Sequence, residues 1–186
     1  MRLETDPGKT VSSLFVFRSI KTNDSCRVDE TYIKVKAAWK YLYRALDSTG
    51  QTIDFMLSAK RDTKAAKRFF RKMLKTHKHQ SPRVINVDRN NAYPPAVEEL
   101  KEEGVLAVTS QLRQRKYLNN IVEQDHRFIK RRINPGLGFF SFKTARWTIV
   151  EYEAMHMMRK GQVEGIGKGD IRGQVRFVES LFKVAA

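Results

Sequence analysis

Apolar and β-branched residues are concentrated in three closely spaced runs in the first third of the chain. These runs lie at 27–35, 41–46 and 53–57, and their composition is typical of β-strands. The tetrapeptide Asp47-Ser48-Thr49-Gly50 separates the second run from the third and has the residue types of a tight turn. The pattern therefore predicts an antiparallel meander of three strands.

The apolar period changes from two to between three and four after Asp62. This spacing continues to Lys75 and predicts an amphipathic helix with Asp62 as its N-cap. The further predicted elements are a strand at 84–87, a helix at 94–103, a strand at 105–108, helices at 117–132 and 144–159, and a short amphipathic segment at 175–182. Three antiparallel strands followed by alternating helices and strands predict a mixed α/β sheet with helices packed on it.

Length and composition exclude several classes of protein. The chain has 186 residues, of which 41% are hydrophobic, which is enough for the core of one domain. Cys26 is the single cysteine, so an internal disulfide and a multi-cysteine zinc site are excluded and an intracellular setting is expected. The apolar runs are only a few residues long, so we expect neither a membrane partner nor a signal peptide.

The charge of the chain points to a polyanionic partner. Lys and Arg number 36 against 20 Asp and Glu, which gives a formal net charge of +16, and nucleic acid is the leading candidate partner. Nine basic residues and two acids lie between Arg113 and Arg146. The helix predicted from Asp62 is also basic, and for that helix both phosphate contact and a plain solvated face remain open.

Three acidic residues occupy positions that suggest chemistry. Asp29 lies inside the first predicted strand, where aspartate is disfavoured, and Asp88 directly follows the strand at 84–87. Glu123 lies on the predicted helix 117–132. Two strand carboxylates and one helix carboxylate can converge at a sheet edge and offer the oxygen ligands that Mg²⁺ prefers. The alternative is that these acids are ordinary solvated charges, with Asp88 part of a turn.

The helix predicted at 117–132 has two distinct faces. Its apolar arc is formed by Ile121, Val122, Phe128 and Ile129. Asp125 falls within this arc and is predicted to be a buried hydrogen-bonding residue. Its polar face carries Glu123 together with Asn119, His126, Arg127 and Lys130. We expect Arg127 and Lys130 to contact phosphate and regard His126 and Asn119 as auxiliary site residues.

Several motifs in a fixed order resemble a known family. They are Arg27–Val35, Tyr41–Asp47, Thr52–Asp62, Val87-Asp88 with Ala92–Pro94, Lys116–Arg127 and Pro135–Gly138. Together they resemble the catalytic domain of bacterial insertion-sequence transposases of the DDE superfamily, in the insertion-sequence-six family. The resemblance covers about residues 22–182.

The resemblance implies a fold and a metal site. The fold would be ribonuclease H-like, with a mixed five-stranded sheet flanked by helices. The catalytic and metal-binding triad would be Asp29, Asp88 and Glu123, and the 34 residues between the last two fit the spacing of the family. The cofactor would be Mg²⁺ or Mn²⁺, with two ions when DNA is bound.

The resemblance also implies a reaction and partners. The reaction would be metal-dependent nicking of DNA followed by 3′-hydroxyl strand transfer. The partner would be double-stranded DNA, both transposon ends and target, bound by a homo-oligomer in the bacterial cytoplasm at the nucleoid, with no small-molecule substrate. The expected DNA-binding residues are Arg113, Arg115, Lys116, Arg127, Lys130, Arg131 and Arg132.

Three segments are expected along the chain. Residues 1–25 form an atypical leader without the helix-turn-helix of the family, 26–160 the catalytic domain, and 161–186 a glycine-rich linker with a short amphipathic end. Only 28 residues precede Asp29, so we expect an N-terminally truncated transposase. The alternative function is that of a catalytically incompetent remnant that still binds DNA.

Overall fold

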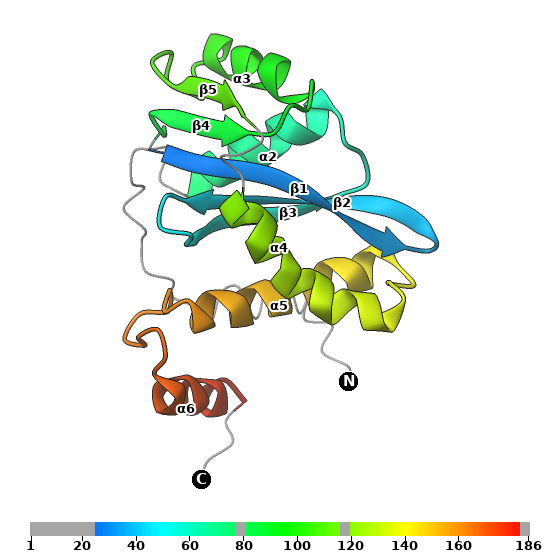
Figure 1. The fold of residues 1–186 in the computed structure, drawn as a ribbon, viewed down its shortest axis with the longest axis vertical. Coiled ribbons are helices and arrows are strands. Elements are labelled where there is room, and N and C mark those ends of the chain that lie inside the picture. The colour runs from blue at the N-terminus through cyan, green and yellow to red at the C-terminus, as the bar shows by residue number, and fades with distance from the viewer. Residues whose placement is uncertain (1–24, 77–80, 116–119, 183–186) are drawn as a thin grey trace, which may run out of the picture. The chain divides into compact units, whose positions relative to one another are not determined.

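The computed structural model describes residues 25–76, 81–115 and 120–182 (Figure 1). The chain divides into two compact units, and the boundary between them lies after Phe139. Almost all of the predicted leader, 1–25, falls outside the described residues. The predicted division of the chain at residues 25 and 160 stays a prediction.

The unit that ends at Phe139 is built on a mixed five-stranded sheet, as the sequence predicted. The strand order is β3-β2-β1-β4-β5. The first three strands pair antiparallel, whereas β4 runs parallel to β1 and β5 parallel to β4. The strands are β1 (Ser25–Val35), β2 (Ala38–Asp47), β3 (Thr52–Ser58), β4 (Val84–Val87) and β5 (Gln111–Gln114).

Local turn chemistry explains the meander. Asp47 accepts hydrogen bonds from the backbone N–H groups of Thr49 and Gln51, at 2.8 and 2.9 Å, which closes the turn predicted between β2 and β3. Between β1 and β2, Lys36 and Ala37 both have positive φ angles, 50° and 61°. A two-residue hairpin of this kind matches the twist of the flanking strands.

Two helices cover one face of the sheet and form the main core with it. They are α2 (Thr63–Thr76) and α3 (Tyr93–Glu102). The apolar stripe of α2, which includes Phe69 and Phe70, is buried against sheet residues such as Val28. Asp62 accepts a 2.8 Å hydrogen bond from the Ala65 N–H, which confirms its predicted role as N-cap of α2.

The helix α4 (Asn120–Ile133) contacts β1 and β2, and its buried stripe differs from the predicted one. The buried residues are Val122, His126, Ile129 and Ile133, which recur every three or four positions along one face. Ile121, predicted to be in the apolar arc, is 39% exposed. The sequence analysis placed His126 on the polar face, and this was wrong, because the buried stripe passes through that position.

A buried ion pair joins α4 to the sheet. The Arg44 side chain of β2 is fully buried, and its guanidinium lies 2.6 Å from the Asp125 carboxylate of α4. Asp125 is therefore a polar anchor whose side chain is only 11% exposed, close to the buried hydrogen-bonding residue that was predicted. Arg44 is the cross-strand neighbour of Asp29, so this ion pair fixes α4 over the part of β1 that carries a candidate site residue.

The segment that follows α4 returns to the end of β1. It contains the short 3-10 helix η2 (Asn134–Gly136). The Phe139 N–H donates to the Lys34 carbonyl at 2.9 Å, and the Lys36 N–H donates to the Phe139 carbonyl at 2.7 Å. Gly138 has a φ of 106°, and a Cβ there would lie 2.7 Å from the Lys34 carbonyl oxygen, so this close approach requires glycine.

The strand predicted at 105–108 is wrong. The backbone N–H groups of Val105 and Leu106 both donate to the Leu100 carbonyl, at 2.9 and 3.0 Å, and so close the end of α3. The fifth strand is β5, whose sequence Gln-Leu-Arg-Gln is mainly polar and exposed. As an edge strand that pairs with β4 alone, β5 carries no apolar pattern that sequence reasoning could recognise.

The described part of the second unit, 140–182, contains two helices, α5 (Phe142–Arg159) and α6 (Ile171–Phe182). Ser141 is the N-cap of α5 and accepts a 3.1 Å hydrogen bond from the Thr144 N–H. A small apolar cluster is formed by Ala154, Met158, Val163 and Ile166 with Phe177 and Val178. Among the described helices, none combines the length and apolarity needed to cross a bilayer.

The ion pair between Arg44 and Asp125 predicts a large effect of one substitution. We expect Asp125→Ala to lower the free energy of unfolding by about 3 kcal/mol, because the buried guanidinium loses its counter-charge. Urea denaturation followed by circular dichroism measures this. The exposed acid Glu102 provides the control, since Glu102→Ala should change stability by less than about 0.5 kcal/mol. Equal stability of the two variants would contradict this role of the pair.

Candidate functional site

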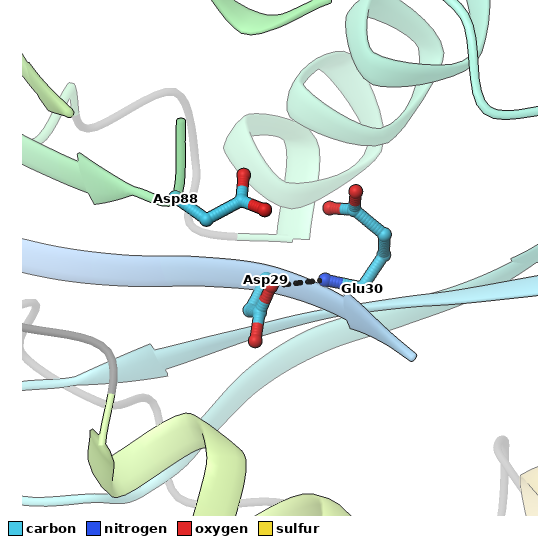
Figure 2. Close-up of side chains that lie close together, drawn as sticks. All are labelled: Asp29, Glu30 and Asp88. Atoms are coloured by element: carbon cyan, nitrogen blue, oxygen red, sulfur yellow. Dashed lines mark hydrogen bonds between the residues drawn. The ribbon is translucent and has the colours of Figure 1, made fainter. Parts of the chain in front are cut away.

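Three carboxylates come together where β1 and β4 lie side by side. Asp29 and Glu30 belong to β1, and Asp88 directly follows β4. The parallel strands pair Arg27 with Asn86, and Asp29 and Asp88 each come two residues later, so they lie at the same level of the sheet. The three acids offer oxygen atoms that all lie within 4.8 Å of one another, as the side chains in Figure 2 illustrate.

The electrostatics of Asp29 reflect this crowding. The residue is only 9% exposed, and its carboxylate accepts a 2.9 Å hydrogen bond from the Glu30 N–H. Burial, together with the negative charges of Glu30, Asp88 and Glu123, raises the pKa of Asp29 from 3.8 to about 7. A cation placed among these acids would reverse the effect, since it would favour the ionised carboxylate.

Glu123 lies near the same carboxylates but belongs to the helix α4. It lies in the first turn of α4 and lines a pocket of about 460 Å³ together with Asp29, Glu30, Tyr32, Arg61, Asp88, Arg89 and Asn90. The structure therefore brings the three acids predicted as a triad, Asp29, Asp88 and Glu123, into one pocket. Within the described residues, the tight carboxylate cluster contains Glu30 rather than Glu123.

Glu30 is a site residue that the sequence analysis missed. Its carboxylate accepts hydrogen bonds from Arg61 Nε, from Tyr93 Oη and, at 2.8 Å, from Asn90 Nδ2. Burial and the negative charge of Glu30 raise the pKa of Tyr93 well above its usual value, so the tyrosine stays a donor. The sequence did contain one signal. Glu30 lies two residues after Val28, so both side chains are on the strand face that packs on the core, where a charged residue is unexpected.

His126 lies close to Asp29 but does not face solvent. Its Nδ1 is 3.9 Å from Asp29 Oδ2, which is beyond hydrogen-bond distance. Burial, followed by the positive charges of Arg44 and Lys130, lowers the pKa of His126 to about 3. The ring is therefore neutral at neutral pH, and the auxiliary role predicted for His126 stays a prediction.

The predicted DNA-binding residues are exposed wherever the structure describes them. These are Arg113, Arg115, Arg127, Lys130, Arg131 and Arg132. Arg132 lies over the ring of Phe128, with 3.7 Å between the guanidinium carbon and the ring centroid. Lys116 and Asn119 lie outside the described residues. DNA contact by this set stays a prediction.

Three basic side chains of α2 form ion pairs with acids of the protein. Lys67 lies 2.8 Å from Glu103, Arg71 pairs with the same acid, and Lys72 pairs with Asp54. These three basic residues are therefore compensated within the protein. The sequence left open phosphate contact or a plain solvated face for this helix, and the structure instead pairs these three side chains with acids of the protein.

Sequence comparison identifies the family. A model of the IS240-type transposase DDE domain matches residues 23–162. The chain belongs to the DDE-domain transposases of insertion sequences. It is 36% identical over 138 residues to the transposase for insertion sequence-like element IS431mec of Staphylococcus aureus, and this match covers 72% of the chain. The same figures hold for the transposase for insertion sequence element IS257 in transposon Tn4003 of that organism. The resemblance to the insertion-sequence-six family is thereby confirmed.

The transposase domain also has structural relatives. The match spans 57% of the length of each of these two curated relatives. The integrase catalytic core domain of HTLV-2, solved in complex with magnesium, superposes with a TM-score of 0.54 at 16% identity and covers 83% of this chain and 98% of that one. The catalytic core of BIV integrase gives 0.51 at 12% identity and covers 87% and 99%. These likenesses confirm the predicted ribonuclease H-like fold.

The raised pKa of Asp29 predicts how stability depends on pH. Since the pKa is about 7 in the folded protein against 3.8 as the ordinary value, the stability that the neutral carboxyl contributes is present below about pH 4 and lost as the pH rises through 7. We therefore expect Asp29→Asn to raise the Tm by a few degrees at about pH 8 in chelator-treated buffer, and to change it little at about pH 4. Differential scanning calorimetry at both pH values measures this.

The matched control for this experiment is Glu102→Gln, an exposed acid of α3. Its effect on the Tm should be small at both pH values, because an exposed carboxylate loses little hydration on folding. A lower Tm for Asp29→Asn at pH 8 would contradict the account of the site as a set of mutually repelling, partly buried acids.

Proposed function

We propose that this transposase domain carries out metal-dependent nicking of DNA and transfer of the resulting 3′-hydroxyl to a target strand. The observation that carries the proposal is the convergence of Asp29, within β1, and Asp88, directly after the neighbouring parallel strand β4, on the pocket that Glu123 also lines. Glu30 lines the same pocket, but its carboxylate already accepts hydrogen bonds from Arg61, Asn90 and Tyr93, so we do not include it in the proposed triad.

The residues present suit a divalent metal ion. Asp29 and Asp88 offer carboxylate oxygens within 4.8 Å of each other, which are the hard ligands that Mg²⁺ and Mn²⁺ take in proteins. Burial, and after it the negative charges of Glu30, Asp88 and Glu123, raise the pKa of Asp29, and a bound cation would relieve both effects. Glu123 completes the proposed ligand set from α4. When bound, one or two such ions would supply activation of the attacking oxygen and stabilisation of the leaving one.

The surface charge supports DNA as the substrate. Exposed basic residues lie on β5 and on α4. The helix α4 carries Glu123, and β5 is the strand that precedes it in the chain. Their contacts would be to phosphates, which hold a duplex in place without reading its sequence. We propose further that the domain acts as a homo-oligomer on transposon ends and target DNA, in the bacterial cytoplasm at the nucleoid.

The proposed triad predicts the outcome of a joining assay. The assay combines the protein, Mn²⁺ and a pre-nicked duplex that ends in the terminal repeat of the element, and joined products are resolved on a sequencing gel. We expect Asp29→Asn, Asp88→Asn and Glu123→Gln each to lower joining by at least about 100-fold, since each removes a metal ligand. DNA binding, measured in parallel by gel shift, should change little.

Glu102→Gln again serves as the control acid and should join normally. Full activity in any of the three triad variants would remove that residue from the proposed ligand set. Absence of joining by the wild-type protein, with DNA binding retained, would favour the alternative function of a DNA-binding remnant.

The basic surface predicts a strong dependence of DNA binding on salt. We expect the affinity for a duplex to fall by about 100-fold between 50 and 200 mM salt, because each phosphate contact releases counterions. The double variant Arg131→Ala/Arg132→Ala should lower the steepness of this dependence. Arg71→Ala should leave it unchanged, since Arg71 is paired with Glu103. Fluorescence anisotropy measures the affinity of the wild type and of both variants at each salt concentration. If Arg71→Ala reduced the salt dependence and the double variant did not, DNA contact by Arg131 and Arg132 would be contradicted.

A further inference from the structure

An arginine side chain lies among the carboxylates of the pocket. Arg61 follows β3 and precedes α2, and its side chain is 31% exposed. Its guanidinium donates from Nε to Glu30, from Nη2 to Asp88 Oδ2 at 3.2 Å, and from Nη1 to the Tyr32 hydroxyl at 3.4 Å. Arg61 is therefore the residue that offsets the charge of Asp88 in the structure.

One end of this guanidinium is fixed and the other is not. The Glu30 side chain is only 1% exposed, and Asn90 and Tyr93 hold its two oxygens in place. Glu30 thus anchors Arg61 Nε. Asp88, by contrast, is 30% exposed at the pocket, and its 3.2 Å contact with Arg61 is a single hydrogen bond at the solvent-facing end.

This arrangement conflicts with metal binding at Asp88. A divalent ion binds a carboxylate oxygen at about 2.1 Å, and a guanidinium bonded to the same carboxylate would be a like charge only a few ångströms away. The contact of Arg61 Nε with the buried Glu30 carboxylate holds the guanidinium at the pocket. Its Nη2 end is the part that can turn, and a planar guanidinium with several N–H donors suits phosphate oxygens well.

We propose that Arg61 is a phosphate-binding residue of the active site whose guanidinium alternates between Asp88 and DNA. It neutralises Asp88 when no metal ion is bound, and it contacts the phosphodiester of the DNA when Asp88 holds a metal ion. Glu30 is the positioning residue that keeps Arg61 in the pocket in both states. This inference rests on the proposed function, because it takes Asp88 to be a metal ligand.

The first test measures metal binding without DNA. The Kd for Mn²⁺ is obtained from the electron paramagnetic resonance signal of the free ion. Arg61→Gln should lower this Kd by about tenfold, since a hydrogen bond between charged groups is worth roughly one such factor. Arg61→Lys, which keeps the charge, should stay closer to the wild type. Asp88→Asn should weaken binding in either background.

Arg61→Gln could tighten Mn²⁺ binding in two ways. It removes the guanidinium that competes at Asp88, and it leaves the negative charge of Glu30 without its partner. A double variant separates these two effects. Arg61→Gln/Glu30→Gln removes both members of the ion pair and leaves the net charge of the pocket unchanged. We expect it still to bind Mn²⁺ more tightly than the wild type. A return to the wild-type Kd would show that the bare Glu30 charge caused the gain, and this would overturn the competition between Arg61 and the metal ion.

The second test measures DNA binding with and without Mn²⁺. The probe is a fluorescent duplex whose 3′ ends are dideoxy-terminated, so that it cannot be joined. Arg61→Gln should weaken binding about tenfold with Mn²⁺, as expected for one charged hydrogen bond, and less than about twofold without it. Equal effects in both conditions would overturn the proposed alternation.

The outcomes also distinguish this inference from the proposed function. Mn²⁺ binding that is the same in wild type and Arg61→Gln would overturn the role of Arg61 alone, whether or not the protein joins DNA. Failure of both the wild-type protein and Arg61→Gln to bind Mn²⁺ would overturn both, because Asp88 would then not be a metal ligand even without the competing guanidinium.

Discussion

The parallel pairing of β1 with β4 is the constraint on which the site depends. It places Asp29 and Asp88 at one level of the sheet and forces carboxylates to share a partly buried space. The burial of Asp29, together with the repulsion among these carboxylates, is costly to the fold, as the raised pKa of Asp29 indicates. The core formed by α2 and α3, and the buried pair of Arg44 and Asp125, hold the strands in this arrangement. Strain kept at one place by stability elsewhere is typical of functional sites.

The sequence predicted most of the fold because its strong patterns were local. The β-branched runs, the turn at Asp47 and the N-cap at Asp62 each left a signal that tertiary packing did not override. Two elements were mispredicted for physical reasons. The apolar segment at 105–108 serves to close α3, and β5 is a polar edge strand without an apolar period. Sequence spacing alone could not tell these two segments apart.

The site was predictable in its acids and not in the contacts around them. Asp29 stood out because aspartate is disfavoured inside a strand, and Asp88 because it directly follows a buried strand. Glu30 was hidden beside Asp29 and became visible only through its hydrogen-bond partners. Arg61 lies 27 residues from Asp88 in sequence, and only the packing of the loop after β3 brings them together. His126 shows the reverse error, since a polar residue was assigned to a solvent face although it belongs to the buried stripe of α4.

If this pocket holds a divalent metal ion, as the proposed function requires, an anomalous difference map from crystals of the protein grown with Mn²⁺ will reveal it. We expect a peak about 2.1 Å from oxygens of both Asp29 and Asp88, and no peak there in crystals of Asp88→Asn. A map without a peak at these two carboxylates, from wild-type crystals saturated with Mn²⁺, would contradict the account.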